Sequence, residues 1–163
     1  MTVQSELTAD RPFMPGYGIQ EANQGSGLFP WTAVREKMAA ARNYWVATVR
    51  PDERPHAAPV WGLWVDDTFY FSTGRESRKA KNLTENPAIV VHLESGDDVI
   101  ILEGNVMTVR DEAMLARLDT LYKAKYQVDL MKEEPVFAVR PQTVYAWLEK
   151  DFGGSATRWQ VNA

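Results

Sequence analysis

The sequence contains no cysteine, and only two of its 163 residues are histidine. The absence of cysteine excludes disulfides, thiolate metal sites and cysteine nucleophiles. His56 and His92 have no acidic residue or second histidine at a metal-ligand spacing, so we expect no metal site and assign neither of them a catalytic role. Basic residues are fewer than acidic residues, which gives a formal net charge of −4 and an isoelectric point near 5.2. This balance argues against nucleic acid as the main partner, because nucleic-acid binding depends on a basic surface.

Long apolar runs are missing as well. No stretch approaches the ~18 apolar residues of a membrane span, so we expect no membrane partner. The first 28 residues lack the basic start and apolar core of a secretory signal, and we expect a cytoplasmic protein. The sequence also lacks the glycine-rich loops of nucleotide-binding proteins, the nucleophile elbow of hydrolases and paired catalytic acids.

Apolar material is plentiful: 45% of the chain is hydrophobic and 11% is aromatic, which is enough for one domain with a substantial core. Period-two alternation predicts strands, and apolar residues at helical spacing predict helices. The expected helices are 31–42, one from Ser77 to the Asn86-Pro87 stop, and 111–126; the expected strands are 44–50, 56–64, 68–73, 88–93, 99–109, 136–140 and 143–148. Glu103-Gly104 predicts a bulge or sharp bend in the long strand. The pattern predicts a mainly β protein, an antiparallel barrel with peripheral α-helices.

The two ends of the chain differ from this central region. Residues 1–28 are rich in Gly, Pro, Gln and Ser, so we interpret them as a flexible tail or as an arm laid across a partner subunit. Residues 29–150 form the predicted barrel domain, and residues 151–163 form a C-terminal tail. In that tail Arg158 and Trp159 could reach back over a flat, anionic ligand, because Arg pairs with phosphate and Trp stacks on rings. A frayed tail is the alternative.

The most informative segment follows the strand 68–73. The chain breaks at Gly74 and restarts as a helix whose first turn carries Ser77, Arg78 and Lys79. A hydroxyl at a helix start, free backbone N–H groups, the positive end of the helix dipole and two cations together favour an anion. Arg offers a planar fork of donors and Lys a mobile charge, so we predict a phosphate site. The alternative is a capped, solvated surface helix.

The strand from His56 to Trp64 is a second candidate for ligand contact. Its small residues, and Gly62 in particular, would let the backbone approach a planar ring closely. Trp61 could then shield that ring from water. Ordinary core packing around Trp61 and Trp64 explains the same residues.

Residues 77–87 read Ser-Arg-Lys-Ala-Lys-Asn-Leu-Thr-Glu-Asn-Pro. This segment resembles the phosphate-binding segment of the pyridoxamine 5′-phosphate oxidase family, the flavin-binding split β-barrels, and the likeness extends less specifically over about residues 31–149. The resemblance implies a split antiparallel β-barrel that binds FMN as a homodimer and transfers hydride to or from a small-molecule substrate. The cofactor-binding residues that it implies are Val60, Trp61, Gly62, Phe71, Ser72, Thr73, Ser77, Arg78, Lys79, Asn82 and Trp159.

The resemblance stops short of pyridoxamine phosphate oxidase itself, whose vitamin-recognising segments have no counterpart in this chain. One alternative keeps the fold and replaces FMN by a deazaflavin, as in some reductases of the superfamily. Arg75 and Lys81 would then supply extra cations for its longer acidic tail. Another alternative is a non-enzymatic flavin-binding module. Catalytic residues stay unassigned, because in a flavoprotein the cofactor carries the chemistry.

Overall fold

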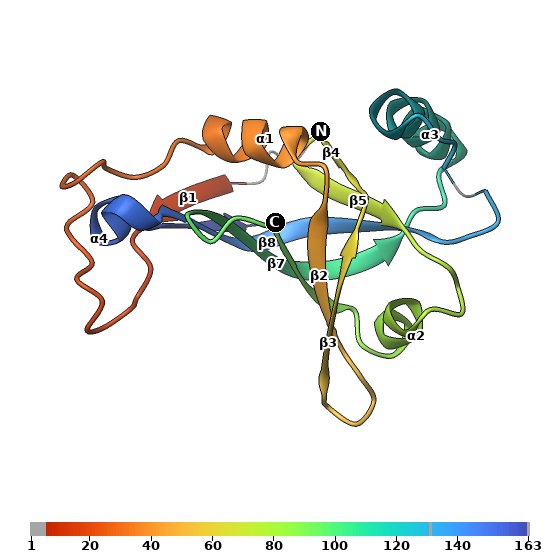
Figure 1. Cartoon of the computed structure of the whole chain (residues 1–163), viewed down its shortest axis with the longest axis horizontal. Helices are drawn as coiled ribbons and strands as arrows, with labels where there is room; N and C mark the ends of the chain where they lie inside the picture. Colours follow the sequence, from red (N-terminus) through yellow and green to blue (C-terminus); the bar gives the residue numbers. More distant parts are fainter. Residues whose placement is uncertain (1–5, 131, 163) are drawn as a thin grey trace.

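The computed structural model describes residues 6–130 and 132–162. Figure 1 shows how its strands and helices are arranged. The strands are β1 (Glu6–Asp10), β2 (Tyr44–Val49), β3 (Pro55–Val60), β4 (Leu63–Val65), β5 (Thr68–Ser72), β6 (Ala88–His92), β7 (Asp98–Thr108), β8 (Val136–Leu148) and β9 (Thr157–Asn162). The helices are α1 (Trp31–Ala40), α2 (Arg78–Glu85), α3 (Glu112–Tyr126) and α4 (Phe152–Ser155), with a 3-10 turn at Glu149–Asp151. The three expected helices are confirmed, whereas α4, β1 and β9 were not expected.

The strands form one antiparallel sheet in the order β1-β9-β8-β7-β6-β2-β3, and β4 pairs with β5, which pairs in turn with β8. The long strand β8 pairs with different strands along its length. Its first half pairs with β5 and its second half pairs with β9, while β7 runs alongside both halves. The sheet therefore curls into a barrel on the β5 side and opens on the β9 side. This is the mainly β architecture that the sequence predicts.

Two local features shape the barrel. The bulge predicted at Glu103-Gly104 is confirmed, because the β7–β8 register shifts there and leaves Gln142 without a partner in the pairing. A Cβ on Gly104 would lie 2.5 Å from the Arg140 carbonyl oxygen, so glycine is needed at this bend. The segments 136–140 and 143–148, expected as two strands, form the single strand β8. The expected strand 56–64 instead breaks after Val60 into β3 and β4.

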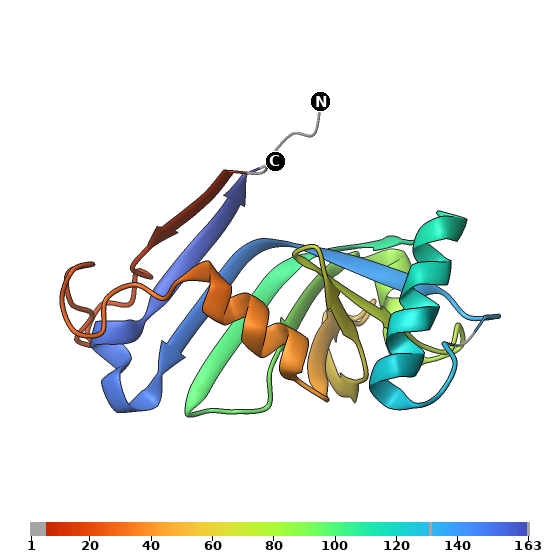
Figure 2. The same ribbon diagram turned by 90° about the horizontal axis from the view of Figure 1, so that it is seen from above.

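Two apolar clusters hold the elements together. The larger lies inside the barrel and buries Val34 and Met38 of α1 together with Ala80 and Leu83 of α2. The smaller lies between α3 and the outer face of β4, β5 and β8, around Leu118. Figure 2 looks onto α1 and α3, which lie on the same side of the sheet, and α2 lies on the other side, beside β2 and β3 (Figure 1).

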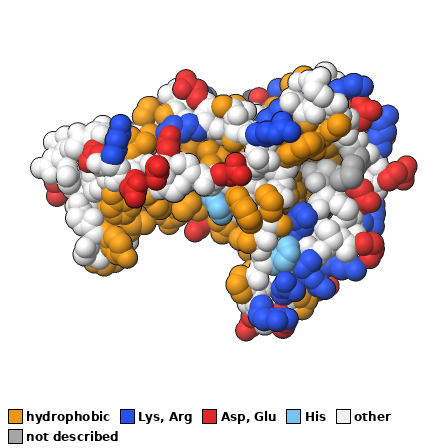
Figure 3. Space-filling model, in the orientation of Figure 1, with side chains coloured by type: hydrophobic (Ala, Val, Ile, Leu, Met, Phe, Trp, Pro, Cys, Tyr) orange, Lys and Arg blue, Asp and Glu red, His pale blue; other side chains and the backbone are white. Residues whose placement is uncertain are grey.

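The sheet also presents an apolar face that points away from the barrel interior. Trp45, His92, Ile101 and Tyr145 occupy one row across β2, β6, β7 and β8, and all four are half-buried. The rings of Trp45 and His92 stack with centroids 6.4 Å apart. Hydrophobic side chains gather in the hollow of this face (Figure 3). We refer to these four residues as the outer row.

The C-terminal segment corrects the expectation of a tail. Strand β9 pairs with β8 on one side and with β1 on the other, so residues 157–162 belong to the sheet. The neighbouring segment 11–29 is fastened to the same end, because the Ser26 hydroxyl donates to Asp151 at 2.5 Å and Arg11 Nη1 donates to the Ala156 carbonyl at 2.9 Å. Residues 1–5, part of the expected N-terminal arm, lie outside the described residues, and the domain boundary at residues 29 and 150 stays a prediction.

No helix in the described ranges is long and apolar enough to cross a membrane.

Candidate functional site

The first turn of α2 forms the candidate anion site. Ser77 caps the helix: its Oγ accepts the Ala80 N–H at 3.2 Å and lies 3.2 Å from Thr73 Oγ1. The first backbone N–H groups of an α-helix have no acceptor within the helix, and the helix dipole is positive at this end. The hydroxyls of Thr73 and Ser77 therefore lie beside amide groups that can receive an anion. We call this arrangement, with Arg78 and Lys79, the α2 corner.

Further positive charge reaches the α2 corner from the β2–β3 hairpin. Burial lowers the pKa of the His56 imidazole, and the charges of Arg50, Lys79 and Arg78 lower it further. Within the described residues Arg50, Arg78 and Lys79 form no ion pair with a carboxylate. In Figure 3 Lys and Arg side chains gather around a histidine beside this hairpin. Cations held together without an acidic partner favour a bound anion.

The position of α2 depends on a buried hydrogen bond to β2. Asn82 is 0% exposed, and its Nδ2 donates to Thr48 Oγ1 at 3.0 Å. The Asn82 Oδ1 atom and the His56 Nδ1 atom are both buried and have no hydrogen-bond partner among the described residues. Because Asn82 belongs to α2 and Thr48 belongs to β2, this hydrogen bond fixes α2, and with it the α2 corner, against the sheet.

The structure separates the other predicted residues from this corner. Val60 and Phe71 lie in the main core, and Ser72 Oγ donates to the Pro135 carbonyl at 3.0 Å. Trp159 is 1% exposed and packs edge-on against Trp31 with ring centroids 5.6 Å apart. Strand pairing holds the Trp159 side chain in the core, and its assignment as a cofactor-binding residue stays a prediction.

Gly62 and Trp61 belong to the junction between β3, β4 and α3. A Cβ on Gly62 would lie 2.3 Å from the ring of Phe69, so the ring that approaches this glycine is part of the protein. The Tyr126 hydroxyl lies 2.9 Å from both the nitrogen and the oxygen of Gly62. Trp61 stacks on Tyr126 with centroids 4.6 Å apart. Core packing, the alternative interpretation of this strand, is the one that the structure favours.

A lysine that the sequence analysis did not single out lies at the same junction. Lys125 Nζ donates to Tyr44 Oη at 2.9 Å and to the Gly62 carbonyl at 3.0 Å. Burial, and secondarily the charge of Arg42, lowers the pKa of Lys125 to about 8. Lys125 lies on the last turn of α3, whereas the residues that its amine contacts, Tyr44 and Gly62, are distant in the sequence. The local sequence therefore does not reveal its burial.

The extra cations proposed for a deazaflavin tail are engaged elsewhere. Lys81 pairs with Glu76 at 2.9 Å, and Arg75 Nη2 donates to the Glu133 carbonyl at 3.2 Å. The structure instead places Arg50 near the α2 corner. Arg50 and His56 lie at the facing ends of the expected strands 44–50 and 56–64, and the short connection between these strands was the local signal that could have brought them together.

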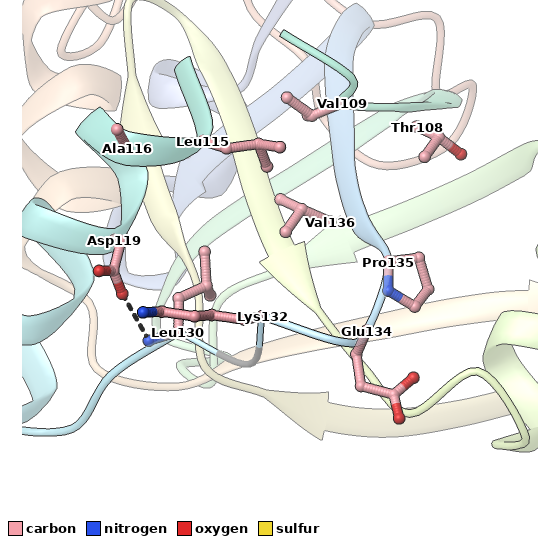
Figure 4. Close-up of a pocket in the computed structure, with 10 residues that line it drawn as sticks. All are labelled: Thr108, Val109, Leu115, Ala116, Asp119, Leu130, Lys132, Glu134, Pro135 and Val136. Carbon is pink, nitrogen blue, oxygen red and sulfur yellow. Dashed lines mark hydrogen bonds between the residues drawn. The ribbon is translucent and has the colours of Figure 1, made fainter. Parts of the chain in front are cut away.

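A cavity of about 400 Å³ lies elsewhere, between α3 and the ends of β7 and β8 (Figure 4). Its wall is mainly aliphatic, with Val109, Leu115 and Val136 among its residues. Two of its carboxylates already have partners: Asp119 accepts the Leu130 N–H at 2.9 Å, and Glu134 accepts the Arg75 N–H at 2.6 Å. None of its lining residues belongs to the α2 corner, so we base no function on it.

The fold is an antiparallel β-barrel, and the α2 corner is its candidate anion site at a helix N-terminus. The sequence profile of the pyridoxamine 5′-phosphate oxidase family matches residues 31–148, and the chain belongs to this family. No protein of curated function matches the sequence.

Solved structures support the split-barrel fold. A conserved hypothetical protein from Mycobacterium tuberculosis is 20% identical, with a TM-score of 0.65 over 74% of this chain and 85% of that one. A heme storage protein from Vibrio cholerae is 14% identical, with a TM-score of 0.59 over 71% of this chain and 91% of that one. An F420 reductase is 24% identical, with a TM-score of 0.53 over 67% of this chain and 94% of that one. At these identities the likeness shows the fold alone.

Proposed function

We propose that this protein is an FMN-binding oxidoreductase that holds the cofactor phosphate at the α2 corner. The observation that carries the proposal is the group of Arg50, Arg78 and Lys79 beside a capped helix start, none of which forms a salt bridge among the described residues. The family assignment agrees with such a cofactor. When bound, FMN would supply hydride transfer to or from a small organic substrate.

The residues present fit a phosphate monoester. Arg78 and Lys79 are charge-assisted donors, and the Thr73 and Ser77 hydroxyls can add neutral hydrogen bonds. His56 Nδ1 has no hydrogen-bond partner in residues 6–130 and 132–162, which leaves one ring nitrogen to bond a ligand oxygen. In this arrangement the chain's own residues bind and orient the cofactor.

A deazaflavin is the second candidate, and Arg50 is the observation that favours it, because a longer acidic tail requires a further cation. One structural neighbour carries the name F420 reductase. Another is named as a heme storage protein, and a non-enzymatic binding module remains the third candidate. Titration of the purified protein with FMN and with the deazaflavin, comparing dissociation constants, decides between these cofactors; uptake of neither favours the third candidate.

Loss of either corner cation is expected to weaken FMN binding. Arg78→Ala and Lys79→Ala should each cost about 1.5–3 kcal/mol of binding free energy, the range for hydrogen bonds to charged groups. Isothermal titration measures the change. Riboflavin, which lacks the phosphate, should bind the parent and both variants alike. Lys81→Ala is the matched control on the same helix, because Lys81 is paired with Glu76.

The His56 pKa gives a second readout of the same site. In the free protein it lies below the usual value of 6.5, because burial and three cations disfavour the charged ring. A bound phosphate favours the charged ring, so FMN should raise this pKa and riboflavin should not. NMR titration of the ring protons follows it, with His92→Gln assigning the two histidine signals. FMN binding that leaves both the His56 pKa and the affinity of Arg78→Ala unchanged would place the phosphate elsewhere.

We also propose that the protein is a homodimer formed through the outer row. Trp45, His92, Ile101 and Tyr145 leave a contiguous, half-exposed apolar strip on the sheet. Contiguous apolar surface of this kind marks an interface more often than it faces solvent. Ile101, at the centre of the row, is the residue whose charge would disturb this contact most.

Ile101→Glu is expected to convert the dimer into a folded monomer, because the carboxylate would be buried without a partner at the interface. Sedimentation equilibrium at micromolar concentration measures the mass, and circular dichroism checks the fold. Met107→Glu is a matched control, since Met107 is exposed on the same strand and lies outside the row. A parent protein that sediments as a folded monomer contradicts the dimer.

A further inference from the structure

At the junction between β3, β4 and α3, two cationic side chains, Arg42 and Lys125, lie beside the same aromatic ring, that of Tyr126. Lys125 Nζ lies 5.1 Å from the centre of the Tyr126 ring, and Arg42 Cζ lies 5.7 Å from it. Arg42 also lies 5.1 Å from the centre of the Trp61 ring. Within the described residues neither cation forms an ion pair with a carboxylate. Two like charges close together repel each other, and an anion between them would relieve that repulsion.

An uncharged amine can keep both hydrogen bonds of Lys125. A neutral amine has two N–H bonds and one lone pair, and Lys125 Nζ has two acceptors, Tyr44 Oη and the Gly62 carbonyl oxygen. With both N–H groups engaged, the lone pair is left over for another group. The Tyr44 hydroxyl is itself fixed, because it donates to the Met38 carbonyl at 2.5 Å. The amine is therefore held in place by β2 on one side and by the β3–β4 junction on the other.

The surrounding groups bring the neutral form within reach of physiological pH. Burial and the charge of Arg42 lower the pKa of Lys125 to about 8, so a substantial minority of the amines is uncharged at pH 7.5. The hydroxyls of Tyr44 and Tyr126, whose rings lie beside the amine, stay protonated, since burial raises the pKa of both. No carboxylate among its described contacts holds the proton on the amine. Such a desolvated lysine beside a second cation has the properties of a nucleophile.

We propose that Lys125 is a nucleophilic amine that condenses with a small 2-oxo acid, whose carboxylate pairs with Arg42. In this step a bond forms between Nζ and the carbonyl carbon, and the carbon–oxygen bond breaks. The oxygen leaves as water after taking up two protons, both from the attacking amine in the net balance, and the product is an imine. No oxidant or reductant takes part. The planar 2-oxo acid would lie beside the Trp61 and Tyr126 rings.

The experiment traps the imine in the full-length protein. Glyoxylate is added with cyanoborohydride, which reduces the imine to a stable secondary amine, and peptide mapping by mass spectrometry locates the adduct. At pH 7.5 Lys125 should be labelled more than ~10-fold faster than Lys123, because an amine reacts only in its neutral form. Lys123 is the matched control on the same helix: it is paired with Asp129 at 2.8 Å, which raises its pKa. The labelling rate of Lys125 should rise with pH and level off above about 8.

Two variants separate the two parts of the proposal. Lys125→Arg keeps a cationic donor for Tyr44 and Gly62, so it should remain folded by circular dichroism but lose the adduct at this position. Arg42→Gln should slow labelling by glyoxylate about tenfold more than labelling by formaldehyde, which has no carboxylate, the effect of losing about 1.4 kcal/mol of binding. A smaller loss common to both aldehydes reports the higher pKa that Lys125 has without the charge of Arg42. Labelling of Lys125 no faster than that of Lys123 overturns the nucleophile. Equal slowing with both aldehydes, or with neither, overturns the carboxylate site at Arg42.

Discussion

Gly62→Ala is expected to lower the free energy of unfolding by about 3 kcal/mol, at the upper end of the usual range for overpacking a core. The new methyl group would lie 2.3 Å from the Phe69 ring and 2.8 Å from the Tyr70 carbonyl oxygen. Phe69 is 0% exposed, so its ring has no open space into which to move. Displacement of the glycine would also stretch its hydrogen bonds to Tyr126 and Lys125. Chemical denaturation followed by circular dichroism measures the loss.

Gly96→Ala is the matched control, because a Cβ at Gly96 has no atom within 4 Å and its backbone does not require glycine. We expect that substitution to change the stability by less than about 0.5 kcal/mol. If Gly62→Ala were as stable as the parent but failed to bind FMN, the glycine would be adjacent to the cofactor ring after all. The packing described for the β3–β4 junction would then be wrong.

The fold was largely accessible from the sequence because its strongest signals are local. Ser77 and Asp111 were expected to begin helices, and each accepts a backbone N–H three residues ahead, from Ala80 and Met114. The strands 56–64 and 68–73 were expected to follow each other closely, and between them Asp66 and Asp67 adopt the left-handed backbone of a tight hairpin. Caps and turns of this kind depend on a few adjacent residues, so a single sequence reveals them.

The candidate site could be predicted from the sequence only in part. The α2 corner is continuous in sequence from Thr73 to Lys79, which is why its residues could be named in advance. Arg50 and His56 reach it through the β2–β3 pairing and the packing of α2 on β2, which depend on the whole fold. The assignment of Gly62 to the cofactor ring stays a prediction for a different reason. A sequence shows that a glycine permits a close approach, but it does not show whether the approaching ring belongs to a ligand or to Phe69.

The structure of the chain ends also depends on contacts between residues that are distant in the sequence, so it could not be predicted from local patterns. The polar segment 1–28 and the short segment 151–163 indicated loose ends, because each segment alone has little to bury. Each is ordered by the other: β1 pairs with β9, and Asp151 receives the Ser26 hydroxyl. Partners about 125–150 residues apart leave no periodic signal in either segment.

Trp159→Ala is expected to destabilise the protein by about 3–5 kcal/mol, the cost of removing a buried tryptophan side chain. Its side chain fills the main core against Trp31 and lies on a strand between β8 and β1. Loss of that anchor should loosen β9 first, so amide hydrogen exchange in β1 and β9 should rise more than in β2. Gln160→Ala, one residue later and exposed, should change stability by less than about 0.5 kcal/mol. If Trp159→Ala kept the parent's stability and lost only FMN affinity, Trp159 would act as part of a mobile tail over the cofactor. The pairing of β9 with β8 would then not persist in solution.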